Sequence, residues 1–139
     1  MMMILGEFTF ELKTAAYQTF KRTSAQRWSQ HDRVGKRAMY QYLGPANDEV
    51  TLPGVIYPEF NGIDSQFSLD KLRDMADAGI PYNMIDRDGF VQGDFIILNI
   101  SEDKSNFLKG GVAQKISFEI KLRRYADDEL ASIKNDLSL

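Results

Sequence analysis

The sequence predicts a mainly β fold with one α-helix, arranged as an antiparallel β-barrel or sandwich. About seven segments have strand-like composition or alternation and are joined by turn residues, whereas a single segment has clear helical periodicity. That helix has one apolar side, so it must pack against a sheet. Strands connected as hairpins make antiparallel sheets, and the helix is expected to cover one face or opening.

The helix is predicted over residues 68–78, where apolar side chains recur at the spacing of one helix face. Ser68 is expected to be the N-cap, and Gly79 to adopt the left-handed conformation that ends the helix. Arg73 and Asp77 are one turn apart, so an ion pair between them is expected on the exposed side.

Strands are predicted on both sides of this helix. Near the start, Phe8 and Phe10 alternate with polar residues, and residues 112–124 alternate over their whole length. An Asp-Gly pair between residues 82–85 and 90–100 predicts a hairpin. The other strand-like segments are residues 19–28, 39–43 and 50–60.

Two polar segments, residues 30–37 and 101–111, are predicted to be exposed loops because they lack apolar alternation. Pro53 and Pro58 interrupt a predicted strand, and each must lie at an edge, a bulge or an end because proline has no N–H to donate.

The length of 139 residues fits one domain. We expect a β domain over residues 1–125 and an acidic, partly ordered tail over residues 126–139. Without cysteine there is no disulfide and no thiolate metal site. A net charge of -3 is too small to give the whole chain affinity for nucleic acid or membranes.

Catalytic chemistry is poorly supported. His31 is the only histidine, so a nucleophile pair has to be built on it, and a solvated loop histidine is the preferred interpretation. The adjacent acids Glu102 and Asp103 are interpreted as solvated charges, and the segment after Asp86 matches a calcium loop poorly. We therefore predict no catalytic residue, no cofactor and no metal, with an enzyme built on His31 as a minor alternative.

A cluster of basic and aromatic residues is the main candidate functional feature. Three interpretations are open: an oligomer interface, which is favoured, an inert surface, or a nucleic-acid surface. The cluster comprises Lys21, Arg22, Arg27, Arg33, Lys36 and Arg37 with Phe20, Trp28, Tyr40 and Tyr42.

Several short segments follow one another along residues 3–125. They are Met3-Ile4-Leu5-Gly6, Arg33-Val34-Gly35-Lys36-Arg37, Tyr42-Leu43-Gly44-Pro45, Thr51-Leu52-Pro53-Gly54, Phe90-Val91-Gln92-Gly93 and Ile116-Ser117-Phe118. In their order and spacing they resemble the GpU family of tail proteins from contractile-tailed phages and prophages. The resemblance implies a virion structural protein needed for tail assembly, similar in fold to the Hcp-like tail-tube barrels, with no catalytic residues to transfer.

The resemblance also implies a hexameric ring at the baseplate-proximal end of the tail tube, in the virion tail after assembly in the bacterial cytoplasm. Its partners would be copies of itself and the tube, hub and baseplate proteins, with no membrane and no nucleic acid. The alternative is a nucleic-acid-binding β-barrel that uses residues 30–37, and it predicts a steep loss of binding with salt. The expected interface residues are Arg33, Lys36, Arg37, Tyr40, Tyr42 and Phe107.

Overall fold

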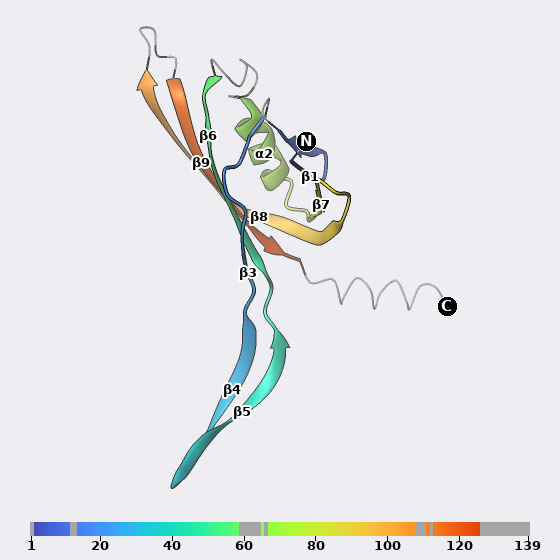
Figure 1. Ribbon diagram of the computed structural model, residues 1–139, viewed down its shortest axis with the longest axis vertical. Coiled ribbons are helices and arrows are strands. Elements are labelled where there is room, and N and C mark those ends of the chain that lie inside the picture. The colour runs from blue at the N-terminus through green and yellow to red at the C-terminus, as the bar shows by residue number, and fades with distance from the viewer. Residues whose placement is uncertain are drawn as a thin grey trace, which may run out of the picture.

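A curled antiparallel sheet and a helix form the body of the molecule, and a two-stranded ribbon extends from it (Figure 1). The computed structural model describes residues 2–11, 14–58, 65, 67–107, 111 and 113–125. The strands are β1 (Met3–Leu5), β2 (Phe8–Phe10), β3 (Lys21–Thr23), β4 (Gln26–Arg33), β5 (Lys36–Pro45), β6 (Glu49–Ile56), β7 (Tyr82–Asp86), β8 (Val91–Phe107) and β9 (Ala113–Arg124), and the helix is α2 (Ser68–Asp77).

The body sheet has the order β2-β1-β7-β8-β9-β6-β3, and all neighbouring strands are antiparallel. The ribbon pairs β4 with β5. The predicted class is therefore confirmed: the described part of the chain is mainly antiparallel β with the helix α2. The hairpin predicted around the Asp-Gly pair is also confirmed, since β7 pairs with the start of β8.

The core lies inside the curl of the sheet. Phe8 and Phe10 from one end of the strand order and Leu52 from β6 near the other end belong to a single buried cluster. Leu69 and Leu72 of α2 enter the same cluster and are fully buried. Among the described residues no ladder joins β2 to β3, and the helix packs against β8 on the core side of the sheet.

The helix agrees with its predicted bounds to within one residue, but its first turn differs. Phe67 occupies the N-cap position with φ -91° and ψ -5°, and no side-chain cap hydrogen bond is present. The prediction of Ser68 as the N-cap is wrong, because the backbone is already helical at Phe67 and Ser68 is buried in the first turn. Gly79 has φ 68°, which confirms the predicted left-handed end.

Arg73 links the helix to the sheet. Its guanidinium lies 3.1 Å from an oxygen of Asp70 and 2.9 Å from an oxygen of Glu102 on β8. The predicted pair with Asp77 is not the one formed, because Glu102 points from the inner face of β8 toward the helix. A tertiary contact that periodicity alone does not reveal has replaced the local one.

The loop prediction is wrong for residues 30–37 and 101–107, while residues 108–110 lie outside the described residues. Residues 30–37 belong to β4 and β5, which meet at a tight turn where Gly35 has φ 70°. Residues 101–107 continue β8, and Ser101 pairs with Glu119 of β9. These strands are held by backbone ladders and bury little side-chain surface, so they carry no apolar alternation. The predicted tail, residues 126–139, lies outside the described residues.

Pro53 lies inside β6, beside a segment that approaches from outside the strand. Its carbonyl accepts a hydrogen bond from the Gln18 amide at 2.8 Å. In a strand the nitrogen and carbonyl of one residue point to the same side, so the missing N–H faces this segment and the ladder to β9 is intact. Pro53 therefore lies where no N–H is needed for the ladder to β9, as expected from the sequence.

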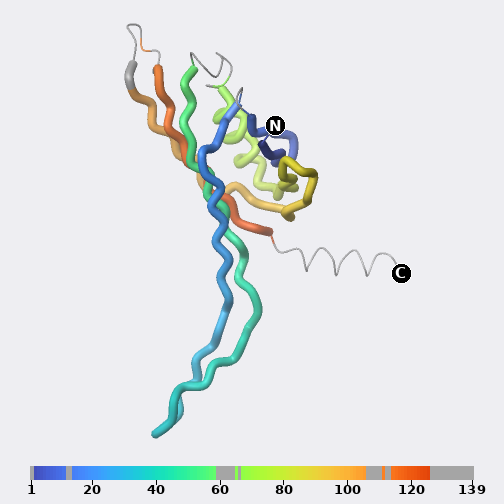
Figure 2. Tube along the Cα trace, in the orientation of Figure 1, coloured from blue at the N-terminus to red at the C-terminus, as the bar shows by residue number. Residues whose placement is uncertain are grey.

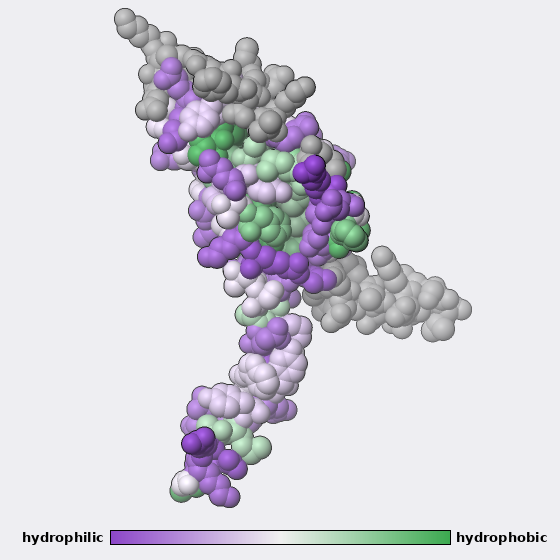
Figure 3. Space-filling model, viewed as in Figure 1, coloured by the Kyte–Doolittle hydropathy of each residue, from purple (hydrophilic) through white to green (hydrophobic). Residues whose placement is uncertain are grey.

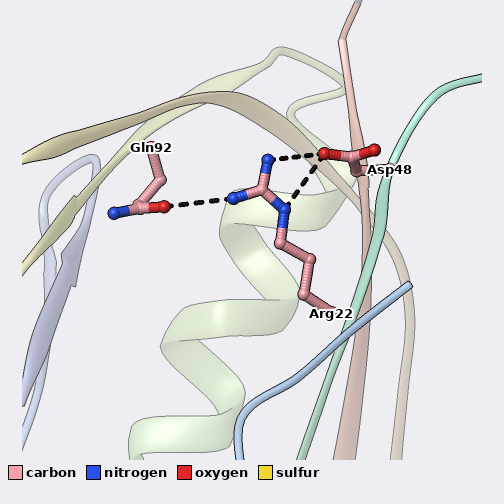
Figure 4. Close-up of polar contacts among 3 residues, drawn as sticks. All are labelled: Arg22, Asp48 and Gln92. Carbon is pink, nitrogen blue, oxygen red and sulfur yellow. Dashed lines mark hydrogen bonds and ion pairs between the residues drawn. The ribbon is translucent and has the colours of Figure 1, made fainter. Parts of the chain in front are cut away.

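An ion pair fastens the body at the point where the ribbon leaves it (Figure 4). The Arg22 guanidinium on β3 donates to one carboxylate oxygen of Asp48, with Nε at 3.0 Å, and to the Gln92 side-chain oxygen at 3.2 Å. The Arg22 hydrogen bond is the main cause that lowers the pKa of Asp48 from its usual 3.8, against an opposing effect of burial. Three segments distant in sequence are thereby held together.

We predict that Gly54→Ala destabilises the fold. A Cβ at this position would clash with the Phe118 ring and lie 2.7 Å from the Ala16 carbonyl oxygen, which as backbone cannot easily move. Overpacking of this kind costs about 1–3 kcal/mol, measurable by chemical denaturation. Val55→Thr on the opposite face of β6 is the control, and an equal loss in both variants would contradict this account.

We predict that Arg22→Met lowers stability at neutral pH by about 1 kcal/mol, the upper range for a partly exposed pair. Because the folded pKa of Asp48 is lowered, its contribution is present above about 3.8 and is lost as the pH falls through the folded value. The difference between wild type and variant should therefore shrink toward pH 3. Denaturation curves at both pH values test this, with exposed Arg87→Met as the control; a pH-independent difference would refute it.

Candidate interaction surfaces

The ribbon formed by residues 26–45 of β4 and β5, here called the arm, projects away from the body (Figures 1 and 2). None of its residues belongs to the buried core. A two-stranded hairpin of this kind is marginally stable by itself in water. The arm is therefore a surface feature whose residues do not serve to fill the core.

One face of the arm is aromatic. Trp28 lies directly opposite Tyr42, and Gln30 opposite Tyr40, so Trp28, Tyr40 and Tyr42 share this face. The rings of Trp28 and Tyr42 pack with centroids 4.8 Å apart. The three side chains are nevertheless 56%, 61% and 50% exposed, so they form a sizeable surface without a partner in the monomer.

The other face of the arm carries the only histidine. Nε2 of His31 lies 3.4 Å from the Ser29 hydroxyl and 3.3 Å from the Gln41 side-chain oxygen. A nucleophile and base need a third group that orients the base and a site that excludes water. Here the three side chains form an exposed hydrogen-bonded row on an open ribbon, and this row does not exclude water from His31.

The basic residues predicted as interface contacts gather at the tip of the arm. Arg33 donates from Nε and Nη2 to the Arg37 carbonyl at 3.0 and 2.9 Å, so its guanidinium fastens the turn. Lys36 and Arg37 are exposed. The structure thus brings Arg33, Lys36 and Arg37 together with the aromatic face on one element.

Phe107 is separate from the other predicted residues. It ends β8, where its backbone pairs with Ala113 of β9. In Figure 1 this end of the β8–β9 hairpin lies at the opposite extremity from the arm. The six predicted residues therefore belong to two distant parts of the chain's fold.

Sequence reasoning missed a hollow of about 280 Å³ on the body, here called the acidic hollow. Burial, followed by the negative charge of Asp86, raises the pKa of Tyr17 within it. Phe20 beside Tyr17 is 40% exposed. The hollow draws on three separate segments, so no local sequence signal identifies it. Its lining residues are Met2, Met3, Tyr17, Phe20, Asp86, Arg87, Asp88 and Gln92.

In the described part of the chain, the acidic motifs have other roles than binding a metal. The Asp86 carboxylate accepts from the backbone amides of Asp88 and Phe90 at 3.0 and 2.9 Å and so organises the β7–β8 turn. Glu102 and Asp103 are neighbours on a strand and point to opposite faces. Within the described residues no group of three or more His, Cys, Asp or Glu side chains is placed to hold a metal.

Strand edges add a second kind of surface. β2 and β3 stand at the ends of the sheet order, and β8 beyond Phe95 pairs with β9 alone among the described strands. Unpaired edges are templates for another chain. No helix in the described part of the chain is long and apolar enough to cross a membrane.

A β-rich body with an exposed aromatic arm and open strand edges is the form of a structural protein that assembles with others. The chain belongs to the phage P2 GpU family, whose model matches residues 6–127. It is accordingly a phage tail-associated structural protein, as the resemblance in the sequence implied.

Two further comparisons show proteins that the chain resembles in sequence or in fold. It is 29% identical over 132 residues to a probable tape measure protein of Halomonas phage phiHAP-1, covering 94% of this chain and 15% of that protein. It is similar in fold to the crystal structure of the SPP1 Dit (gp 19.1) protein, described as a paradigm of the hub adsorption apparatus in phages infecting Gram-positive bacteria. That likeness has a TM-score of 0.61 and 7% identity, and covers 88% of this chain and 49% of Dit.

We predict that the body folds without the arm. The Ala46 amide donates to the Ala25 carbonyl at 2.9 Å, so Asn-Gly in place of residues 26–45 closes the chain with a two-residue hairpin turn. Because the arm buries nothing in the core, we expect the free energy of unfolding to change by less than about 1 kcal/mol, the scale of a surface change. Thermal unfolding followed by circular dichroism tests this; loss of a cooperative transition would show that the arm is part of the folding unit.

Proposed function

We propose that this chain forms a ring at the baseplate-proximal end of a contractile phage tail tube, where it connects the tube to the hub. Copies of itself and the tube, hub and baseplate proteins are its partners, and its role is structural rather than enzymatic. The observation that carries the proposal is the exposed aromatic arm on a protein of the GpU family.

The composition of the arm supports a protein interface. Aromatic residues and arginine are enriched in interfaces, and the tightly packed, desolvated ones carry most of the binding energy. Trp28, Tyr40 and Tyr42 provide such a surface, and a docked arm is no longer limited by the marginal stability of a lone hairpin. The open edge of β8 supplies a second contact through which neighbouring sheets can join.

Two contacts argue against the nucleic-acid alternative. The Arg33 guanidinium donates from Nε and Nη2 to the Arg37 carbonyl, which fixes its orientation and leaves it fewer N–H groups for a phosphate. Trp28 and Tyr42 pack against each other with their ring planes tilted by 54°, so each ring has less free surface for stacking on a base.

The Halomonas phage relative supports a place beside a tape measure protein. There the matching segment makes up 15% of a longer protein named as a probable tape measure protein. Two units joined in one chain act side by side, so we infer that this protein also lies next to the tape measure protein of its own tail. The hub description of Dit, a protein of similar fold, agrees with a position near the hub.

The test is the solution mass by light scattering, alone and with the tail-tube protein of the same phage, at low and high salt. We expect rings or a co-complex that persists at high salt, because apolar and backbone contacts are weakly screened. The variant with Asn-Gly in place of residues 26–45 should lose this assembly while staying folded. Salt-sensitive DNA binding without tube contact would overturn the proposal, since phosphate binding weakens steeply with salt.

His31→Ala separates the structural role from an enzymatic one. The histidine contacts two exposed side chains and contributes nothing to the core. We therefore expect this variant to assemble tails as well as wild type, measured by rescue of plaque formation in a phage that lacks the wild-type protein. Tails of normal appearance without infectivity would instead point to chemistry at His31.

A further inference from the structure

We propose that the arm of one copy docks into the acidic hollow of the next copy. Trp28 and Tyr40 from the aromatic face would enter the hollow, and the basic tip would meet its carboxylates. This inference rests on the proposed ring, and it identifies the two surfaces through which neighbouring copies of the ring would bind each other.

The hollow matches the arm chemically. Tyr17 packs near Phe10 and Phe20, with centroids 5.6 and 6.3 Å away, and so provides an aromatic wall. With about 280 Å³ the hollow is slightly smaller than the roughly 300–1,000 Å³ of small-molecule pockets, and it suits inserted side chains. Its surroundings are thus those of an aromatic anchor site.

Charges favour the same pairing. Asp88 is exposed at the hollow, and the structure gives its carboxylate no hydrogen bond within the described residues. Lys36 and Arg37 at the arm tip are exposed cations. Lys36 lies four residues before Tyr40 on β5, about 13 Å along the strand. One arm can therefore place a ring in the hollow and a cation beside its rim.

The occupant is a second copy rather than the same one, because the arm extends away from its own body (Figure 2). Two arms do not suit each other either. The arm carries four of the seventeen basic residues of the chain and one of its twenty acidic residues, so arms repel each other and the remainder of the chain is acidic. An arm on a neighbouring body is a head-to-tail contact, and such contacts form a ring when the rotation from one copy to the next closes.

The space-filling view shows how apolar surface is distributed between the body and the arm. Figure 3 shows apolar side chains exposed on the body within a hydrophilic surround, while the narrow arm is mostly pale and hydrophilic, with some apolar residues near its tip. The body thus exposes apolar surface on this face, and aromatic groups that can cover it are on the arm.

The experiment uses two variants of the full chain. An arm variant, Trp28→Ser with Tyr40→Ser, keeps the hollow, and a hollow variant, Phe20→Lys with Asp88→Lys, keeps the arm. Ser29→Ala with Gln41→Ala, on the opposite face of the arm, is the matched control. Circular dichroism and thermal unfolding verify that each variant is folded.

Self-association is measured by sedimentation up to about 1 mM protein, where even weak contacts of about -4 kcal/mol are half formed. We expect each variant alone to associate at least tenfold more weakly than wild type and the control to associate normally. An equal mixture of the two variants should recover a complex of two chains, because one copy supplies an intact arm and the other an intact hollow.

Three results would overturn the inference: a wild type that stays monomeric, a hollow variant that associates normally, or a mixture that is not rescued. The second would indicate contact between arms, because the hollow variant keeps its arm intact. Failure here is distinguishable from failure of the proposed function, because a salt-tolerant complex with the tail-tube protein would still support a ring built through other surfaces.

Discussion

The pairing of β9 with both β6 and β8 is the constraint on which the rest of the structure depends. Ladders run from Glu49↔Arg123 to Ile56↔Ile116 on one side and from Phe95↔Arg124 to Phe107↔Ala113 on the other. Because side chains alternate, these ladders direct one face of all three strands inward and leave the other polar. The helix α2 has a place to pack only because this inner face exists.

The body and the arm are stabilised in different ways. The body buries one continuous cluster, whereas the arm relies on backbone pairing and on cross-strand contacts worth roughly 0.2–1 kcal/mol each. The Arg22–Asp48 pair fastens the body where the arm begins. An element with so little internal stabilisation can be ordered further by docking, and this connects the arm to assembly. The same reasoning explains how a fold similar to Dit exists at 7% identity, since ladders and alternation tolerate many side chains.

The candidate site was predictable in part. Basic and aromatic residues between Arg33 and Tyr42 stand out in the sequence, and they lie on one element because a hairpin keeps sequence neighbours together. Phe107 is separated from them because β8 carries it to the other end of the sheet. The acidic hollow had no local signal, since Tyr17 and Asp86 meet only through the order of the strands.

The sequence by itself determined the class of the fold, the bounds of the helix and the alternating strand β9, because these follow from periodicity and turn residues within one segment. Tertiary structure decided what depends on distant partners. It turned the polar residues 30–37 and 101–107 into strands, since a ladder needs only a paired backbone. It also decided that Arg73 forms an ion pair with Glu102 rather than with Asp77, because packing brings β8 beside the helix. Local patterns report which face a residue prefers, whereas the partner on that face is set by the fold.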